Sequence, residues 1–184
     1  MLNIVNGLIV LLLSINVAFA STSTSKTLTD WQTTLPELLN SSPTKLIGKA
    51  TFSVFIWDIY KSKLSTTSGR FPDKAGSLVY QINYLKNIDS EDLIEKTVEQ
   101  WQHLEFKPER YQGYVSQLKS MWPDIKEGDQ LAFVTKSGKS AFYYNNQLIG
   151  SIDNPDFATI FLAIWFSENT TQPALRDKLL GIAS

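Results

Sequence analysis

The 184-residue chain contains no cysteine and only one histidine. Without cysteine no disulfide framework can form, so the fold has to be stabilised by the packing of its core. The usual ligands of zinc, haem-thiolate and iron–sulfur centres are almost absent as well. Phosphate loops, dinucleotide-binding glycine motifs and nucleophile elbows do not occur in the sequence either. The sequence therefore predicts neither a cofactor nor a metal site.

Charge is missing from one end of the chain. All 17 basic and 18 acidic residues follow Ala20, and the net charge is −1. A nucleic-acid partner requires a clustered basic surface, whereas the lysines and arginines here are scattered along the sequence. We therefore expect no nucleic-acid partner, and the oligomeric state stays open.

The uncharged residues 1–20 have the features of a secretory signal peptide. An apolar block runs from Gly7 to Leu13, and Ala18-Phe19-Ala20 has the small-x-small spacing that signal peptidase recognises. We expect cleavage after Ala20 and a periplasmic or secreted protein. No membrane span is expected after cleavage, because a span needs about 20 consecutive apolar residues and no run of this length follows Ala20. Retention as an uncleaved anchor is the alternative, since no lysine or arginine precedes the block.

The length that remains fits a single domain. We expect a polar leader and a short helix over residues 21–44, and one folded domain over residues 45–184. Apolar patterns predict strands within residues 46–64, 78–86, 131–136, 140–144 and 147–152. Capping residues and helical periodicity predict helices that begin near Asp89, Pro108, Asn154 and Pro173. This order favours an α+β fold, an antiparallel β-sheet with helices packed on one face.

Residues 46–64 are rich in β-branched and aromatic side chains and predict one long strand or two strands joined by a bend. Both alternating sets of side chains are largely apolar, so we expect both faces to be covered. Asp58 lies between Ile56 and Tyr60 in this pattern. Its carboxylate must either be turned outward by a bulge or find a partner.

Tyr60, Tyr84 and Lys86 are the first candidates for contacts with a ligand. Tyr84 and Lys86 fall on the same face of the strand predicted over residues 78–86, with Gln81 and Asn83 on the more polar side. Lys86 either reaches into water or converges with the two phenols. Two phenols and an ammonium in an apolar cleft would bind a carboxylate or a phenolate. Lys49 is a further candidate donor, and no catalytic residue is identified.

Several segments, taken in order, resemble the chalcone isomerase-like family, in particular its exported bacterial branch. They are Gly48-Lys49-Ala50-Thr51-Phe52, Trp57-Asp58-Ile59-Tyr60, Tyr84-Leu85-Lys86, Glu127-Gly128-Asp129, and Phe157 to Trp165 followed by Ala174-Leu175-Arg176. The resemblance implies an open-faced β-sandwich, in which a ligand cleft lies between an antiparallel sheet and its helices.

The resemblance also implies two kinds of function. Plant enzymes of the family close a chalcone to a flavanone by intramolecular addition of a phenolate, using an Arg on an early strand, a Thr, a Tyr and an Asn. Related non-catalytic members bind fatty acids through an Arg and a Tyr. In this sequence Lys49 is the cation nearest to the early-strand Arg position, and Trp57 falls near the Thr position. Lysine lacks the bidentate fork of arginine, which favours binding over catalysis.

The leading hypothesis is therefore an exported, non-catalytic protein that binds a small amphipathic acid, such as a fatty acid. The residues expected to contact this ligand are Tyr60, Tyr84, Lys86, Lys49, Trp57 and Asp58. One alternative is an intramolecular lyase that acts on a phenolic or enone substrate. Another is a structural or interaction module of the cell envelope, whose cleft is filled by its own side chains.

Overall fold

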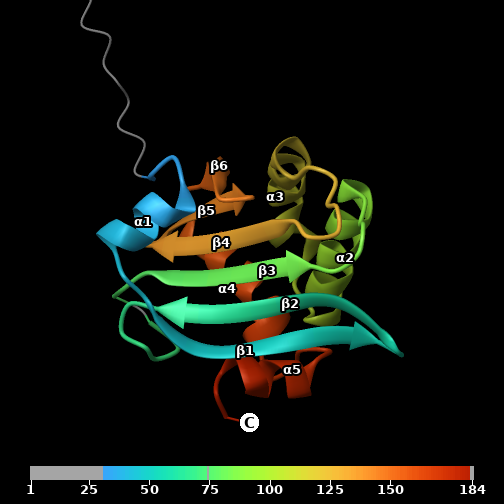
Figure 1. Cartoon of the computed structure of the whole chain (residues 1–184). Helices are drawn as coiled ribbons and strands as arrows, with labels where there is room; N and C mark the ends of the chain where they lie inside the picture. Colours follow the sequence, from blue (N-terminus) through green and yellow to red (C-terminus); the bar gives the residue numbers. More distant parts are fainter. Residues whose placement is uncertain (1–30, 74, 183–184) are drawn as a thin grey trace, which may run out of the picture.

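The computed structural model describes residues 31–73 and 75–182. This part of the chain forms one six-stranded antiparallel sheet, in the order β1-β2-β3-β4-β5-β6, together with five helices (Figure 1). The α+β fold expected from the sequence is confirmed. The predicted signal peptide and the polar leader up to residue 30 lie outside the described residues.

The strands follow one another as neighbours in the sheet, and α2 and α3 are inserted between β3 and β4. Their bounds are β1 Lys45–Val54, β2 Trp57–Thr66, β3 Leu78–Tyr84, β4 Gln130–Lys136, β5 Lys139–Tyr144 and β6 Gln147–Ile152. The helices are α1 Leu35–Ser41, α2 Ser90–His103, α3 Pro108–Met121, α4 Pro155–Phe166 and α5 Pro173–Leu179. The predicted helix starts at Pro108, Pro155 and Pro173 are confirmed, because proline is suited to the first turn of a helix.

Helices cover both faces of the sheet, although unequally. The large core between the sheet and α2 to α5 is rich in aromatic side chains. On the opposite, outer face, α1 packs Leu35 and Leu38 against the middle strands (Figure 1). Gln81 on β3 is buried as well, and its Nε2 donates to Gln130 Oε1 at 3.2 Å. The more polar side of β3 is therefore covered at this position.

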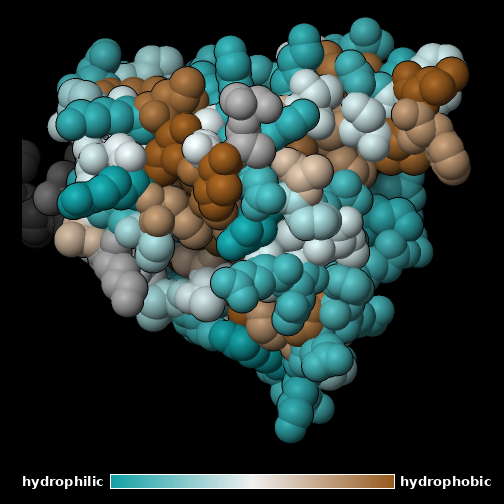
Figure 2. All heavy atoms as spheres, turned by 90° about the horizontal axis from the view of Figure 1, so that it is seen from below, coloured by the Kyte–Doolittle hydropathy of each residue, from teal (hydrophilic) through white to brown (hydrophobic). Residues whose placement is uncertain are grey.

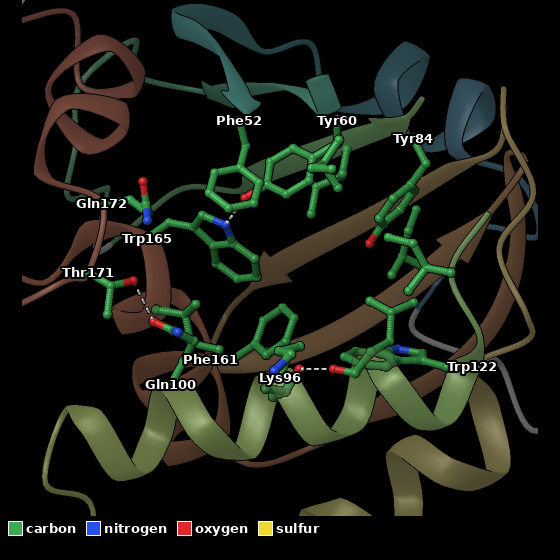
Figure 3. A pocket seen from close by; sticks show the side chains of 17 residues that line it. Phe52, Tyr60, Tyr84, Lys96, Gln100, Trp122, Phe161, Trp165, Thr171 and Gln172 are labelled. Carbon is green, nitrogen blue, oxygen red and sulfur yellow. Dashed lines mark hydrogen bonds between the residues drawn. The ribbon is translucent and has the colours of Figure 1, made fainter. Parts of the chain in front are cut away.

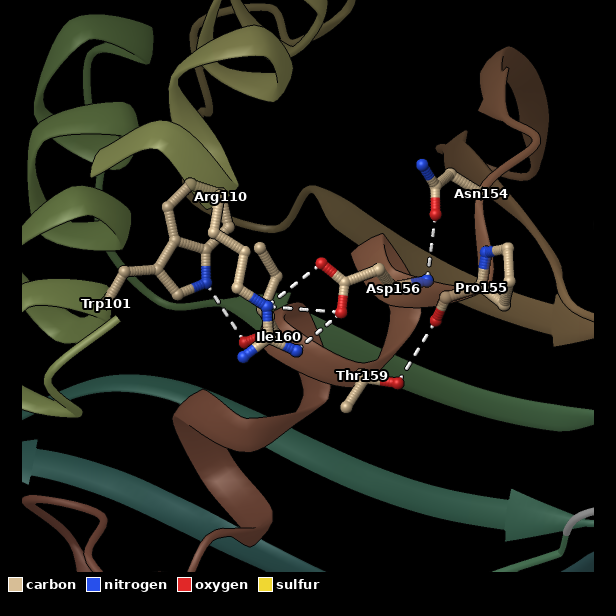
Figure 4. A network of polar contacts seen from close by, with 7 residues as sticks. All are labelled: Trp101, Arg110, Asn154, Pro155, Asp156, Thr159 and Ile160. Atoms are coloured by element: carbon tan, nitrogen blue, oxygen red, sulfur yellow. Dashed lines mark hydrogen bonds and ion pairs between the residues drawn. The ribbon is translucent and has the colours of Figure 1, made fainter. Parts of the chain in front are cut away.

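Polar contacts tie the helices to one another on the side away from the sheet (Figure 4). The Nε of Arg110 on α3 donates to Asp156 Oδ2 on α4 at 2.9 Å. The indole Nε1 of Trp101 on α2 donates to the carbonyl oxygen of Ile160 on α4 at 2.9 Å. These contacts join α2 and α3 to α4.

Residues 46–64 belong to two strands joined by a turn, β1 and β2, which is one of the two predicted alternatives. The turn consists of Phe55 and Ile56, whose side chains are exposed by 98% and 86%. Lys49, Lys61 and Lys63 are exposed on the outer face of the hairpin. The expectation that both faces are covered is wrong, because the turn removes two apolar residues from the strand pattern and leaves polar residues on the outer face.

Among residues 31–73 and 75–182, no helix has the length and hydropathy that crossing a membrane requires.

Candidate functional site

A cavity of about 250 Å³ lies between the inner face of the sheet and helices α2 and α4 (Figure 3). Most of its wall is apolar or aromatic: Phe52, Ile59, Tyr60, Ile82, Tyr84, Ile88, Leu93, Trp122, Leu131, Phe161, Ile164 and Trp165. Polar wall residues come from α2 and from the segment before α5: Lys96, Thr97, Gln100, Thr171 and Gln172. Such a mixture is typical of a site for an apolar ligand that is oriented by a few polar groups.

The register of the first three strands places a row of aromatic rings on the sheet side of the cavity. Phe52 pairs with Tyr60, and Tyr60 pairs with Tyr84. Directly opposed residues of antiparallel strands point to the same face. The ring centroids of Phe52 and Tyr60 are accordingly 5.0 Å apart, and those of Tyr60 and Tyr84 are 6.0 Å apart.

The hydroxyl of Tyr60 joins the sheet to the helix layer. It accepts a hydrogen bond of 3.0 Å from the indole Nε1 of Trp165 on α4 (Figure 3). Burial raises the pKa of Tyr60 to about 12. The phenol is therefore neutral at physiological pH, and its own proton stays available for donation.

Two further donors on the wall lack a partner among the described residues. The hydroxyl of Tyr84 points into the cavity (Figure 3), and burial raises the pKa of this phenol, which keeps it protonated. The indole Nε1 of Trp122 is buried and makes no hydrogen bond. A buried donor without a partner costs about 1–3 kcal/mol. The Tyr84 hydroxyl faces the cavity, so an oxygen atom of a ligand could accept a hydrogen bond from it.

The residues predicted for the site separate into two groups. Tyr60 and Tyr84 line the cavity, whereas Lys49, Trp57, Asp58 and Lys86 lie outside its wall. The ammonium Nζ of Lys86 lies 5.1 Å from the ring centroid of Trp57, and both side chains are exposed. Strand β3 ends at Tyr84, so the alternation that placed Lys86 beside Tyr84 stops before it reaches Lys86.

Asp58 is turned outward by a bulge and also has a hydrogen-bond partner, so both possibilities considered for its carboxylate occur. Phe52 pairs with Tyr60 but Ser53 pairs with Asp58, so Ile59 is the extra residue of a bulge. The bulge moves Asp58 to the outer face. There Asp58 Oδ1 accepts a hydrogen bond of 2.6 Å from Ser53 Oγ. Ile59, in contrast, contributes to the cavity wall.

Sequence reasoning did not identify the wall residues on the helix side, notably Leu93, Trp122 and Trp165. Trp165 did carry a signal, because residues 155–166 are apolar around most of the helix and predict a buried element. Leu93 and Trp122 carried none beyond an apolar side chain. Whether such a side chain fills the core or borders a cavity depends on the distance between its helix and the sheet.

The wall offers neutral donors and few charges. Lys96 is the one charged residue in the described wall, and its ammonium is 2.8 Å from the Glu99 carboxylate in a largely exposed ion pair. The described part of the chain contains no group of three or more side chains suited to hold a metal ion. Acid–base catalysis works best with a group that titrates near neutral pH, and the buried phenols do not. The arrangement is suited to enclosing an apolar chain and binding an oxygen-bearing head group.

Comparisons with known proteins agree with this architecture. A family model described as chalcone isomerase-like matches residues 39–181. A solved structure of an Arabidopsis thaliana fatty-acid binding protein superposes with a TM-score of 0.59 and 9% sequence identity, over 75% of this chain and 87% of that chain. At this identity the likeness shows a shared fold. No curated protein matches the sequence.

Proposed function

Because the chain belongs to the chalcone isomerase-like family, we propose that it is a non-catalytic binding protein for a single-chain amphipathic molecule such as a fatty acid. The observation that carries the proposal is an apolar cavity into which the Tyr84 hydroxyl points without a partner among the described residues. Its volume of about 250 Å³ lies just below the ~300–1,000 Å³ of most small-molecule sites, which favours a slender ligand.

The head group and the chain of the ligand have different roles. The Tyr84 hydroxyl would donate to a carboxyl, carbonyl or hydroxyl oxygen. The chain would lie against apolar wall residues such as Ile82, Leu131 and Phe161. Each buried CH₂ group contributes about 0.8 kcal/mol, so the chain supplies most of the affinity. The shared fold with a plant protein named for fatty-acid binding supports this ligand class.

The same wall is poorly suited to closing a phenolic substrate. The pKa values of Tyr60 and Tyr84 are both raised by burial, so neither phenol is a base at neutral pH. No arginine or histidine belongs to the described wall, and the ammonium of Lys96 is held by Glu99. A phenolate nucleophile would gain little stabilisation here, which is why binding is proposed in preference to cyclisation.

Isothermal titration with saturated fatty acids of increasing chain length tests the proposal. We expect one site per chain, with an affinity that rises with length until the cavity is full. Leu93→Trp fills the cavity from α2 and should abolish binding. Leu39→Trp is the matched control, because Leu39 is a partly buried helical leucine on the outer face of the sheet. The absence of binding to the unmodified protein, or turnover of a chalcone, would overturn the proposal.

We further propose that the protein is an exported member of the family, cleaved after Ala20 and located in the periplasm or outside the cell. The support is the uncharged segment of residues 1–20 and the spacing Ala18-Phe19-Ala20. The intact mass of the protein isolated from its own host provides the test. A chain that starts at Ser21 is expected, and a membrane-bound chain that retains residues 1–20 would contradict export with cleavage.

A further inference from the structure

The β1–β2 hairpin ends in an apolar tip, which we define as Val54, Phe55, Ile56 and Trp57. These side chains are exposed by 42%, 98%, 86% and 59%. Six large apolar side chains are exposed in the described part of the chain, and four of them are these consecutive residues. The tip projects from the sheet in Figure 1, and Figure 2 shows hydrophobic atoms gathered at the corresponding right-hand edge of the molecule. A concentrated patch of this kind marks an interaction surface.

Phe55 has a backbone conformation that glycine adopts more readily than phenylalanine. Its φ is 54°, in the left-handed region that bulky residues rarely adopt. Two-residue hairpin turns normally place Gly, Asn or Asp at such a position. The phenyl ring gains no burial in return, because 98% of it is exposed. Neither turn geometry nor core packing explains an aromatic residue at this position.

Lysines extend from the tip along the outer face of the hairpin. Residues 45–66 contain four lysines and a single acidic residue, Asp58, within a chain whose net charge is −1. Lys49 lies directly opposite Lys63, and Lys61 is on the same exposed face. Within the described residues none of these three lysines forms an ion pair. Like charges placed opposite each other destabilise a sheet, so an anionic surface would relieve them.

Charges elsewhere in the molecule add to the difference in charge between the basic hairpin and the helices. Lys86 adds a cation beside the tip, since its ammonium lies over the Trp57 ring. Helix α2, which packs on the inner face of the sheet, carries four acidic residues and one lysine. An anionic surface would therefore attract the hairpin and repel α2, which orients the molecule.

We propose that the tip docks the protein on an anionic lipid bilayer. Phe55 and Ile56 enter the interfacial region, and the lysines of the outer face lie against the headgroups. Exposed apolar side chains flanked by lysines bind membranes through apolar burial together with attraction to anionic lipids. A second copy of the chain fits less well, because a tip-to-tip contact would bring two basic hairpins together.

The same hairpin forms one side of the cavity. Phe52, Ile59 and Tyr60 belong to the cavity wall and lie within three residues of the tip along the chain. Docking through the tip thus brings this side of the cavity close to the bilayer, where single-chain amphiphiles partition. The docking itself rests on the hairpin alone, so vesicle binding and ligand binding can be measured separately.

Co-sedimentation with vesicles of phosphatidylcholine, with and without phosphatidylglycerol, tests the proposal on the chain that starts at Ser21, which holds every described residue. Binding is expected with phosphatidylglycerol and should weaken in high salt. Phe55→Gly combined with Ile56→Ser should lower vesicle binding roughly tenfold. The melting temperature should stay equal or rise, because glycine suits the positive φ.

Two matched variants separate the contributions. Ile182→Ser removes an isoleucine that is exposed by 68% and lies away from the tip. The preceding Gly181 packs against Ile47, near the end of β1 that is opposite to the tip. This variant should leave vesicle binding unchanged. Lys61→Gln with Lys63→Gln should weaken binding to anionic vesicles only. Equal binding to both vesicle types, or unchanged binding of the tip variant, would overturn the proposal. So would a dimer in sedimentation velocity that the tip variant abolishes, because a second copy would then cover the tip.

Discussion

The layer between the sheet and helices α2 to α5 is solid at one end and hollow at the other. At the solid end, the rings of Phe133, Phe142 and Phe157 pack with centroids 5.1 to 6.0 Å apart. At the hollow end, Tyr60 and Tyr84 border a cavity of about 250 Å³. Aromatic residues dominate both ends, so composition alone does not distinguish a filled core from a binding site.

The difference between the two ends lies in the polar atoms of the rings. The phenylalanines of the solid end have none and can pack on all sides. The tyrosines and tryptophans of the hollow end each carry a donor that needs a partner when it is buried. The Trp165 indole donates to the Tyr60 oxygen, whereas the Tyr84 hydroxyl remains for a ligand. We infer that the solid end provides stability and the hollow end provides binding.

The largest effect is expected at the solid end. Phe142 is fully buried and its ring contacts Trp122, Phe133, Phe157 and Phe161. Phe142→Ala should lower the free energy of unfolding by about 3–5 kcal/mol. Urea denaturation measures this loss. A loss below about 1 kcal/mol would show that the solid end is not the main source of stability.

Alkaline pH should lower the stability of the fold in part through the hollow end. The pKa of Tyr60 is raised from 10.0 to about 12, so the folded state holds its proton more tightly than the unfolded state. This contribution is fully present below pH 10.0 and is lost as the pH rises through about 12. It amounts to roughly 2–3 kcal/mol. Stability measured against pH should fall less steeply in Tyr60→Phe, and an unchanged slope would contradict this role.

Tyr84→Phe tests whether the hollow end binds the head group of the ligand. Removing an unpartnered hydroxyl should leave stability unchanged or raise it, but it should weaken ligand affinity by about 1 kcal/mol, or several-fold in Kd. The matched control is Tyr143→Phe, whose hydroxyl donates to the carbonyl oxygen of Gln32 at 2.9 Å on the outer face. The control should lose stability and keep its affinity. If calorimetry showed a stability loss in Tyr84→Phe and an affinity loss in Tyr143→Phe, the roles assigned to the two hydroxyls would be wrong.

The smallest effect concerns the charge of the head group. The described wall presents neutral donors, and its lysine is paired with Glu99. A fatty alcohol should therefore bind within about tenfold of the fatty acid of equal chain length. Competition between the two ligands measures the ratio. A much stronger preference for the acid would reveal a cation at the head group and would bring Lys96 into the site.

Local signals made much of the fold predictable from the sequence. Proline in the first turn and the Asn154 cap located the helix starts, and alternation located β4 to β6. A bend within residues 46–64 was one of two predicted alternatives, but its position was not predictable, because Phe55 and Ile56 are not usual turn residues and continue the apolar alternation. Tyr60 and Tyr84 could be identified as wall residues because the alternation of side chains along a strand shows which of them share a face.

The helix side of the site was not predictable in the same way. Leu93 looks like any leucine on an apolar helix stripe, and only the spacing between α2 and the sheet makes it a wall residue. The position of α2 depends on contacts between residues far apart in the sequence, such as the hydrogen bond from Trp101 to the carbonyl oxygen of Ile160 on α4. Tertiary distances of this kind are not encoded in any local pattern.

Native mass spectrometry of the chain incubated with hexadecanoic acid tests the central claim most directly. The account predicts one bound ligand per chain for the unmodified protein and for Leu39→Trp, and none for Leu93→Trp, in which the cavity is filled. Equal adducts on all three proteins, or no adduct on the unmodified protein, would contradict it.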